Sequence, residues 1–106
     1  TSAEVYLDVT AVPNENHVVE TFELYQNYPN PFNPTTTLKY GLPESADVTL
    51  TIYNSLGEKI ATLVKGKKSA GIHAVEWNAS KYNSGVYFYE LKTDKFRSVK
   101  KLLFLK

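Results

Sequence analysis

The sequence predicts an all-β fold, an antiparallel β-sandwich of about seven strands with immunoglobulin-like architecture. Short segments of alternating apolar and polar residues recur along the 106 residues, roughly every 8–12 positions, with turn residues between them. Eight Tyr, five Phe and one Trp, together with many Val, Leu and Thr, favour pleated strands. No segment combines a helical apolar period with capping residues. The length suits one domain with one modest core.

The first twenty-one residues are expected to lie outside this domain. Residues 5–9 alternate and predict a short strand or the end of a preceding module, and residues 10–21 are polar and predict a linker. The expected division is therefore 1–21 for the end of a preceding module with its linker, and 22–106 for the sandwich. The chain starts without Met, as a piece of a longer protein would.

Residues 28–34, which we call the proline loop, hold three of the five prolines and form the stretch around which the chain is organised. Each proline fixes its own φ and keeps the preceding residue out of the helical region, which predicts a stiff, extended corner of the sandwich. Tyr28 and Phe32 are expected to pin this loop to the core. The alternative interpretation is a proline-rich docking ligand, which usually lies in a disordered tail.

Seven strands are expected in the domain. They are residues 22–26, 36–40, 46–54, 59–64, 73–77, 86–91 and 96–105. The segment 46–54 alternates most cleanly, with Val48, Leu50 and Ile52 facing inward and the residues between them facing outward. In the segment 86–91 the same argument places Tyr87, Tyr89 and Leu91 on one side.

Turns are expected between these strands. Residues 41–45 form a turn cluster, 54–58 a hairpin with Gly57 at positive φ, 65–71 a basic loop flanked by glycines, 78–85 a turn-rich connection and 93–95 a tight turn. His73, Val75 and Trp77 share one face of their strand, and Trp77 is the expected core anchor.

The residues offer little for catalysis. Cys is absent, which excludes disulfides and thiol chemistry, and the only histidines are His17 in the linker and His73 in a strand. No metalloprotease, serine hydrolase, phosphate-loop or calcium-loop motif is present. We therefore expect no enzyme, no metal and no cofactor. No apolar run is long enough for a membrane helix.

Charge is divided unevenly, although the net charge is only +1. Residues 1–50 carry seven acidic residues against Lys39, and residues 51–106 carry eleven bases against four acidic residues. Neighbouring strands from the two halves are expected to neutralise each other; the alternative is a basic face that meets an acidic partner. Nucleic acid is not an expected partner, because no Arg stripe with interleaved aromatics occurs.

Exposed aromatic side chains are the one feature that suggests a ligand. Tyr53, Phe88 and Tyr25 could form a flat platform on which a sugar stacks. The alternative interpretation is that a small all-β domain uses Tyr simply to cover its faces.

Several segments together resemble a known family. They are residues 24–34, 36–40, 48–57, 71–80, 84–89 and 100–106. In this order and spacing they closely resemble the type A C-terminal sorting domain of the bacterial type IX (Por) secretion system, which is related to the immunoglobulin-like domain of the flagellar hook-capping protein. The resemblance extends from Phe22 to Lys106.

The resemblance implies that the domain is a secretion signal and not an enzyme. Such domains end large exported proteins, which cross the inner membrane with a signal peptide. The type IX machinery recognises the folded domain in the periplasm and carries the protein through the outer membrane to the cell surface. A sortase-like peptidase then cuts before the domain, and the N-terminal cargo is released or joined to lipopolysaccharide. The polar segment 10–21 is the expected place of the cut.

The family's targeting motifs fall on three places of this chain: the proline loop, a glycine-aromatic motif and the lysine-bearing end. The expected targeting residues are Pro29, Asn30, Pro31, Phe32, Asn33, Pro34, Gly85, Val86, Tyr87, Lys100, Lys101, Leu103, Leu105 and Lys106.

The last strand admits two roles. As a terminal strand it can present a free edge and a positive end to the machinery, with Lys100, Lys101 and Lys106 facing outward. Alternatively, core packing by Leu103 and Leu105 is its main role. The domain is expected to be a monomer, with a dimer through this edge as the alternative. The competing function is a permanent immunoglobulin-like accessory module that binds carbohydrate or spaces domains in a cell-surface protein.

Overall fold

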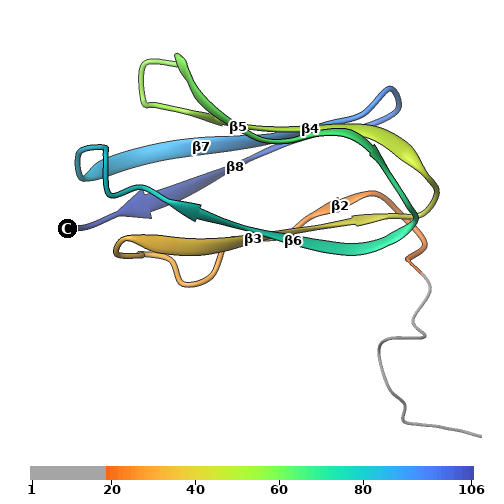
Figure 1. Cartoon of the computed structure of the whole chain (residues 1–106), viewed down its shortest axis with the longest axis horizontal. Coiled ribbons are helices and arrows are strands. Elements are labelled where there is room, and N and C mark those ends of the chain that lie inside the picture. The colour runs from red at the N-terminus through yellow and green to blue at the C-terminus, as the bar shows by residue number, and fades with distance from the viewer. Residues whose placement is uncertain (1–18) are drawn as a thin grey trace, which may run out of the picture.

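The computed structural model describes residues 19–106, which form two antiparallel sheets packed face to face (Figure 1). The strands are β2 (Glu23–Leu24), β3 (Thr35–Leu42), β4 (Ala46–Tyr53), β5 (Lys59–Lys68), β6 (Gly71–Asn78), β7 (Gly85–Lys92) and β8 (Arg97–Phe104). One sheet has the order β2-β3-β6 and the other β5-β4-β7-β8. The predicted fold class is confirmed. The strand expected at 5–9 and most of the linker expected at 10–21 lie outside the described residues.

The core lies between the two sheets and is filled by alternate residues of the central strands. In β4 the expected inward residues Val48, Leu50 and Ile52 are all buried, which confirms that pattern. The other large, fully buried side chains are Leu38, Tyr40 and Leu42 of β3, Tyr89 and Leu91 of β7, and Leu102 and Phe104 of β8. Each buried Leu or Ile contributes about 1.5–3 kcal/mol of transfer free energy.

Two predicted turn residues confirm that local sequence sets the hairpin at 54–58. Gly57 has a φ of 86°, which L-amino acids with a side chain rarely adopt. The Asn54 side chain accepts hydrogen bonds from the backbone N–H groups of Leu56 and Glu58, both at 2.9 Å. This is the local bonding for which Asn is favoured in turns.

Two strands extend into segments that were predicted as turns. The expected turn at 41–45 is wrong at Gly41 and Leu42, which belong to β3 and pair with Ile72 and Gly71. The expected basic loop at 65–71 is also wrong, because residues 65–68 continue β5 against β4. The hydrogen bonds between strands join backbone groups and do not depend on side-chain charge. The lysines of this segment can therefore face solvent while β5 continues to pair with β4.

Gly41 is needed for close packing and not for a turn. A Cβ atom at this position would lie 3.2 Å from Cδ1 of Ile72 and 3.2 Å from Cγ1 of Val19. A glycine inside a strand often marks such an approach.

The predicted strand at 22–26 is reduced to Glu23–Leu24 in β2, although the N–H of Tyr25 still donates to the carbonyl of Lys39 at 3.0 Å. Trp77 is 5% exposed, as expected for a core anchor.

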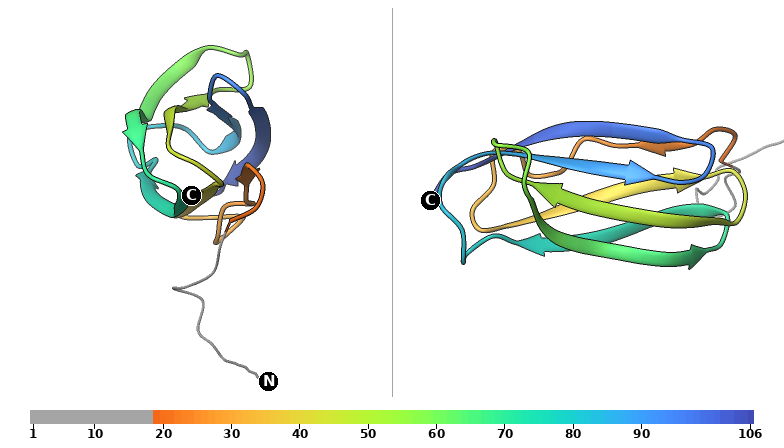
Figure 2. Two further views of the ribbon diagram at one scale, coloured as in Figure 1. Left: turned by 90° about the vertical axis from the view of Figure 1, so that its right-hand side faces the viewer. Right: turned by 90° about the horizontal axis from the view of Figure 1, so that it is seen from above.

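The chain enters the sandwich at one end and finishes at the other. Figure 2 shows the C-terminus at the end opposite to the start of the described chain, beside the connection between β6 and β7. The proline loop, which connects β2 to β3, lies near the same end as the C-terminus (Figure 1). Residues far apart in the sequence therefore meet there.

Candidate functional site

Three segments converge at the C-terminal end of the sandwich, and we call them together the C-terminal junction. They are residues 26–34, 84–87 and 101–106. Gly85, Val86 and Tyr87 stand opposite Phe104, Leu103 and Leu102 in the antiparallel pairing of β7 with β8. The proline loop joins β8 from the other side through a parallel bridge between Phe32 and Phe104. The structure thus brings all three predicted targeting segments into one surface.

The outer edge of β8 is occupied by the proline loop. The N–H of Phe32 donates to the carbonyl of Leu103 at 3.0 Å, and the N–H of Leu105 donates to the carbonyl of Phe32 at 3.1 Å. The N–H of Leu103 also donates to Oδ1 of Asn30 at 2.9 Å. The Nε2 group of Gln26 donates to the carbonyl of Lys101 at 2.8 Å. The expectation of a free edge is therefore wrong for residues 101–105.

Phe32 anchors the middle of the loop in the core. Its side chain is 2% exposed. Its ring stacks on Phe104 with centroids 5.1 Å apart and lies tilted against Trp77 at 5.9 Å. Trp77 in turn meets the edge of Tyr87 at 5.6 Å. The expectation that Tyr28 also pins the loop is wrong, because the Tyr28 side chain is 80% exposed.

A buried polar network holds the start of the loop. Asn27 is 2% exposed, and its N–H donates to the hydroxyl of Tyr89 at 2.8 Å. The Tyr89 hydroxyl donates to the carbonyl of Tyr25 at 2.6 Å. The Nδ2 group of Asn27 donates to Oγ1 of Thr36 at 3.0 Å and to the carbonyl of Pro29 at 3.1 Å. Buried polar groups satisfied in this way specify one arrangement of the chain.

Burial also changes the chemistry of Tyr89. It raises the pKa of the Tyr89 hydroxyl to about 12, although the hydrogen bond from the Asn27 N–H acts in the opposite direction. A tyrosine hydroxyl is protonated at neutral pH in any case, and burial extends the pH range over which it can donate to the Tyr25 carbonyl. Sequence reasoning missed this network, and the polar pair Gln26-Asn27 between a strand and the prolines was the signal that could have indicated it.

The end of the loop is tied to the strand that carries Trp77. The N–H of Ala79, which follows β6, donates to the carbonyl of Pro34 at 2.9 Å. The loop is thus fixed at its start, middle and end. The other predicted loop residues, namely Pro29, Asn30, Pro31, Asn33 and Pro34, have exposed side chains.

The last strand faces the core with residues other than those expected. Leu102 and Phe104 are fully buried, whereas Leu103 is half-buried and Leu105 is 49% exposed. Core packing by Leu103 and Leu105 is therefore wrong. Pairing with β7 sets this register, and a shift of one residue exchanges the two faces of a strand.

The pairing of β8 with β7 also determines which lysine side chains of the last strand are exposed. Lys100 lies on the face of β8 that carries Leu102 and is half-buried, so the expectation that it points freely outward is wrong. Lys101 and Lys106 are exposed. The N–H of Lys106 donates to Oγ of Ser84 at 2.9 Å, which fixes the chain end beside the glycine-aromatic motif.

The predicted sugar platform does not form. Tyr53 and Phe88 are cross-strand neighbours in the four-stranded sheet, whereas Tyr25 follows β2 in the other sheet. The Tyr53 hydroxyl instead donates to the Glu90 carboxylate at 3.1 Å, and Arg97 pairs with the same carboxylate. Burial on its own raises the pKa of Glu90, but the hydrogen bonds from Arg97 and Tyr53 outweigh it and hold this pKa below its ordinary value.

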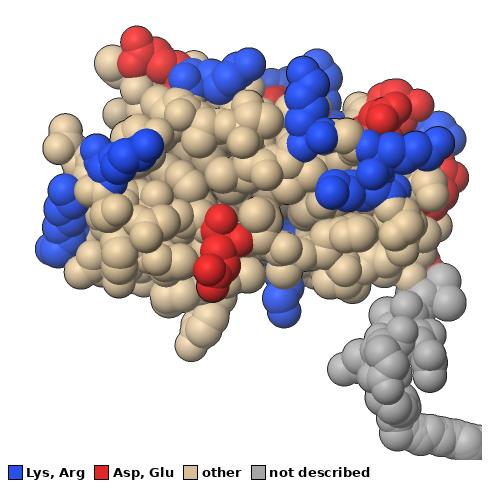
Figure 3. Space-filling view, in the orientation of Figure 1, with Lys and Arg blue, Asp and Glu red and all other residues tan. Residues whose placement is uncertain are grey.

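Acidic and basic side chains lie side by side over the four-stranded sheet (Figure 3). Lys95 pairs with Glu44 at 2.8 Å, and Asp47 stands opposite Lys67 in the pairing of β4 with β5. These contacts place acidic residues of the first half beside basic residues of the second, as the interleaving interpretation expects.

The described residues show no arrangement typical of an active site. The ring of His73 stacks on Tyr40 at 5.2 Å, and its Nε2 lies 2.8 Å from the carbonyl of Ser69. His17 lies outside the described residues. Within residues 19–106 no group of three or more His, Asp or Glu side chains could hold a metal ion, and that same range contains no helix able to span a membrane.

Comparison with known proteins gives one family. The family described as "Secretion system C-terminal sorting domain" matches residues 26–105, which is most of the chain and includes all of the C-terminal junction but the final lysine. A search of curated proteins found none that matches this sequence. The chain therefore belongs to the type IX secretion C-terminal sorting domains, a family that carries a secretion signal and is not a family of enzymes.

Proposed function

We propose that this domain directs a covalently linked N-terminal cargo through the type IX machinery, and that the machinery reads the C-terminal junction. The cargo passes through the periplasm with the folded domain attached and reaches the cell surface or the extracellular space. A sortase-like peptidase then removes the domain by cutting within residues 10–21.

The observation that carries the proposal is the convergence of three targeting segments on one folded surface. The proline loop occupies the edge of residues 101–105, so a partner meets outward side chains and not an unpaired strand edge. Lys101 and Lys106 supply two exposed positive charges there. Exposed charges of one sign steer an oppositely charged partner and set the rate of association.

The same geometry decides which experiment is informative. Deleting residues 101–106 removes the lysines, but it also removes Phe104 and the backbone partners of Phe32 and Asn30. A secretion defect after that deletion could therefore reflect either lost recognition or lost folding. Substitution of the exposed lysines separates the two.

We would fuse residues 1–106 behind a signal peptide and a fluorescent reporter, in a host that has the type IX system. The test variant is Lys101→Ala with Lys106→Ala. The matched control is Lys65→Ala with Lys67→Ala, which removes the same charge from exposed positions of β5. Thermal unfolding of each purified domain checks that all variants are folded.

The proposal expects the reporter outside the cell for the original sequence and the control, and in the periplasm for the test variant. Equal export of both variants would show that the junction lysines are not read. Mass spectrometry of the exported reporter should give a new C-terminus within residues 10–21. An uncut domain that stays attached would favour the permanent accessory module.

We further propose that the domain acts as a monomer. The loop already fills much of the β8 edge that a strand-pairing dimer would use. Size-exclusion chromatography with light scattering should give one 12.0 kDa species.

A further inference from the structure

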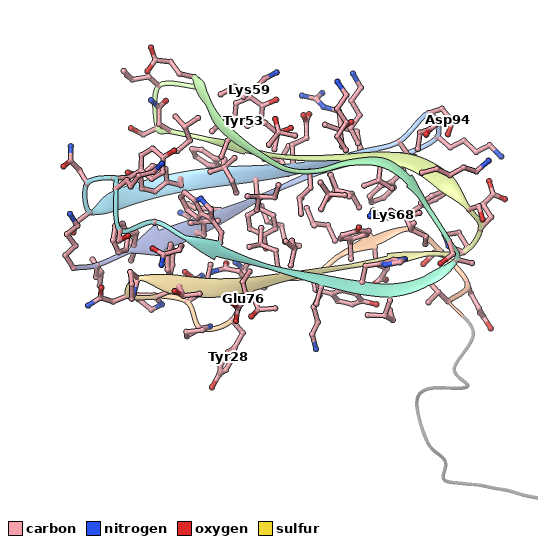
Figure 4. The ribbon with its side chains drawn as sticks, in the orientation of Figure 1. Tyr28, Tyr53, Lys59, Lys68, Glu76 and Asp94 are labelled. Carbon is pink, nitrogen blue, oxygen red and sulfur yellow. The ribbon has the colours of Figure 1, made fainter. Side chains whose placement is uncertain are left out.

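A groove crosses the outer face of the three-stranded sheet, away from the core. Its volume is about 640 Å³, and it is lined by Tyr25, Gln26, Tyr28, Thr37, Lys39 and Ile72. This volume lies within the range of small-molecule sites, roughly 300–1,000 Å³. Figure 4 shows Tyr28 projecting from the sheet on the side away from the core, with Glu76 near its base.

The groove is hollow because its floor carries small side chains. Across the sheet, Thr37 of β3 stands opposite Glu76 of β6, and Lys39 stands opposite Ala74. The short side chains of Thr37 and Ala74 leave space that the larger side chains at the margins do not fill.

Tyr28 is the most exposed aromatic residue of the described chain, yet its backbone is fixed. Its N–H donates to the carbonyl of Thr37 at 3.1 Å, and its carbonyl accepts from the Thr37 N–H at 2.9 Å. On either side of it, Asn27 and the Pro29 carbonyl belong to the buried network. An aromatic ring that is 80% exposed on a fixed backbone is preorganised for stacking.

The polar groups of the groove suit hydroxyl groups. Among the lining residues, Lys39 offers donors and the Thr37 hydroxyl offers both a donor and an acceptor; the Glu76 carboxylate, which stands opposite Thr37 in the pairing of β3 with β6 and beside the lining, offers acceptors. Lys39 in the lining and Glu76 beside it carry opposite charges, so the two together present no net charge to a ligand. Tyr25 and Ile72 add apolar surface at the other margin.

An extended peptide fits this face less well. β3 is the central strand, paired with β2 on one side and with β6 on the other, so its backbone groups are already hydrogen-bonded. A peptide laid across the face could not add to the sheet, which is the usual source of affinity for an extended segment. Ring stacking and hydroxyl bonding remain as sources of affinity.

We propose that this groove binds a neutral oligosaccharide, with the apolar face of a sugar ring stacked on Tyr28 and its hydroxyls bonded to Lys39, Thr37 and Glu76. The site lies on the sheet opposite to the one that carries the junction lysine Lys101. The groove shares Gln26 and Tyr28 with the C-terminal junction, but saccharide binding is a separate activity that can be measured apart from export.

The test is calorimetric titration of the 106-residue chain with neutral hexasaccharides of β-linked glucose, xylose, mannose and N-acetylglucosamine. At least one should bind saturably. Tyr28→Ala should weaken that binding about tenfold, whereas Tyr28→Phe should retain it because the ring remains. The matched control is Leu56→Ala, which removes an 81% exposed side chain in the hairpin between β4 and β5. It should leave the affinity unchanged.

Three results would overturn the proposal. They are the absence of saturable binding to every saccharide, equal affinity of the Tyr28→Ala variant, and a loss in the Leu56→Ala variant as large as in Tyr28→Ala. If no saccharide binds and Tyr28→Ala blocks export of the reporter, the groove contacts a protein of the machinery instead. Binding is measured on purified protein, so a failure of the secretion proposal would not affect this result.

Discussion

Replacing Phe32 by Ala should destabilise the domain more than any other single change in the proline loop. The ring is 2% exposed, stacks on Phe104 and lies tilted against Trp77. Truncating a buried Phe to Ala typically costs about 3–5 kcal/mol, because transfer free energy is lost and a cavity remains. Domains of this size have a free energy of unfolding of about 5–15 kcal/mol, so the change removes a large part of it.

The effect should spread beyond the cavity. Phe32 also carries the two backbone hydrogen bonds that tie the loop to Leu103 and Leu105. When its side chain no longer fills the core, those bonds lose their support and the edge of β8 opens. We therefore expect a fall in Tm of at least about 12 °C, taking roughly 4 °C for each kcal/mol lost.

Urea unfolding followed by the fluorescence of Trp77 is the direct assay. Trp77 is the only Trp, and its ring lies 5.9 Å from that of Phe32. Far-UV circular dichroism on the same samples shows whether the loop opens separately, because the two transitions would then not coincide. Tyr28→Ala is the matched control in the same loop and should change stability by about 0.5 kcal/mol or less, since its side chain is exposed.

A decrease of less than about 1 kcal/mol in the free energy of unfolding of Phe32→Ala would refute this reasoning, because removal of a buried, well-packed Phe side chain destabilises a protein by more than that. Equal losses in Phe32→Ala and in the Tyr28→Ala control would refute it as well. Either result would mean that the loop is not anchored in the core by its phenylalanine.

Three further predictions concern polar groups, and a fourth concerns a turn. Tyr89→Phe leaves the Asn27 N–H buried without its acceptor and should cost about 1–3 kcal/mol in urea unfolding. In the unaltered protein the Tyr89 pKa is raised to about 12, so the contribution of Tyr89 to stability should be fully present below pH ~10 and be lost as pH rises toward 12, as tyrosinate absorbance can follow. Because the folded protein lowers the Glu90 pKa, the Glu90 carboxylate stabilises the fold fully above pH ~4.3, and this stabilisation is lost as pH falls through the pKa of the folded state. Arg97→Ala removes the main partner of that carboxylate, so the free energy of unfolding should depend less on pH in this acid range. Gly57→Ala should cost about 1–2 kcal/mol by thermal unfolding, because φ is 86° there, and an unchanged Tm would contradict the hairpin geometry.

The strand content of this protein was determined by local sequence. Alternation in residues 46–54 predicted the inward face of β4, and Gly57 predicted the hairpin conformation, because each depends only on neighbours along the chain. Trp77 could be assigned to the core for the same reason. The proline loop could be predicted as a rigid corner, since proline restricts its own residue and the one before it.

The site, by contrast, was decided by tertiary contacts. Asn30 and Leu103 are 73 positions apart, and no local pattern could show that the Asn30 side chain accepts a hydrogen bond from the Leu103 N–H. The four apolar residues at 102–105 do not alternate, so only pairing with β7 determines which two of them are buried. Tyr28 and Phe32 look equivalent in the sequence, and only packing decides that Phe32 enters the core while Tyr28 stands in solvent.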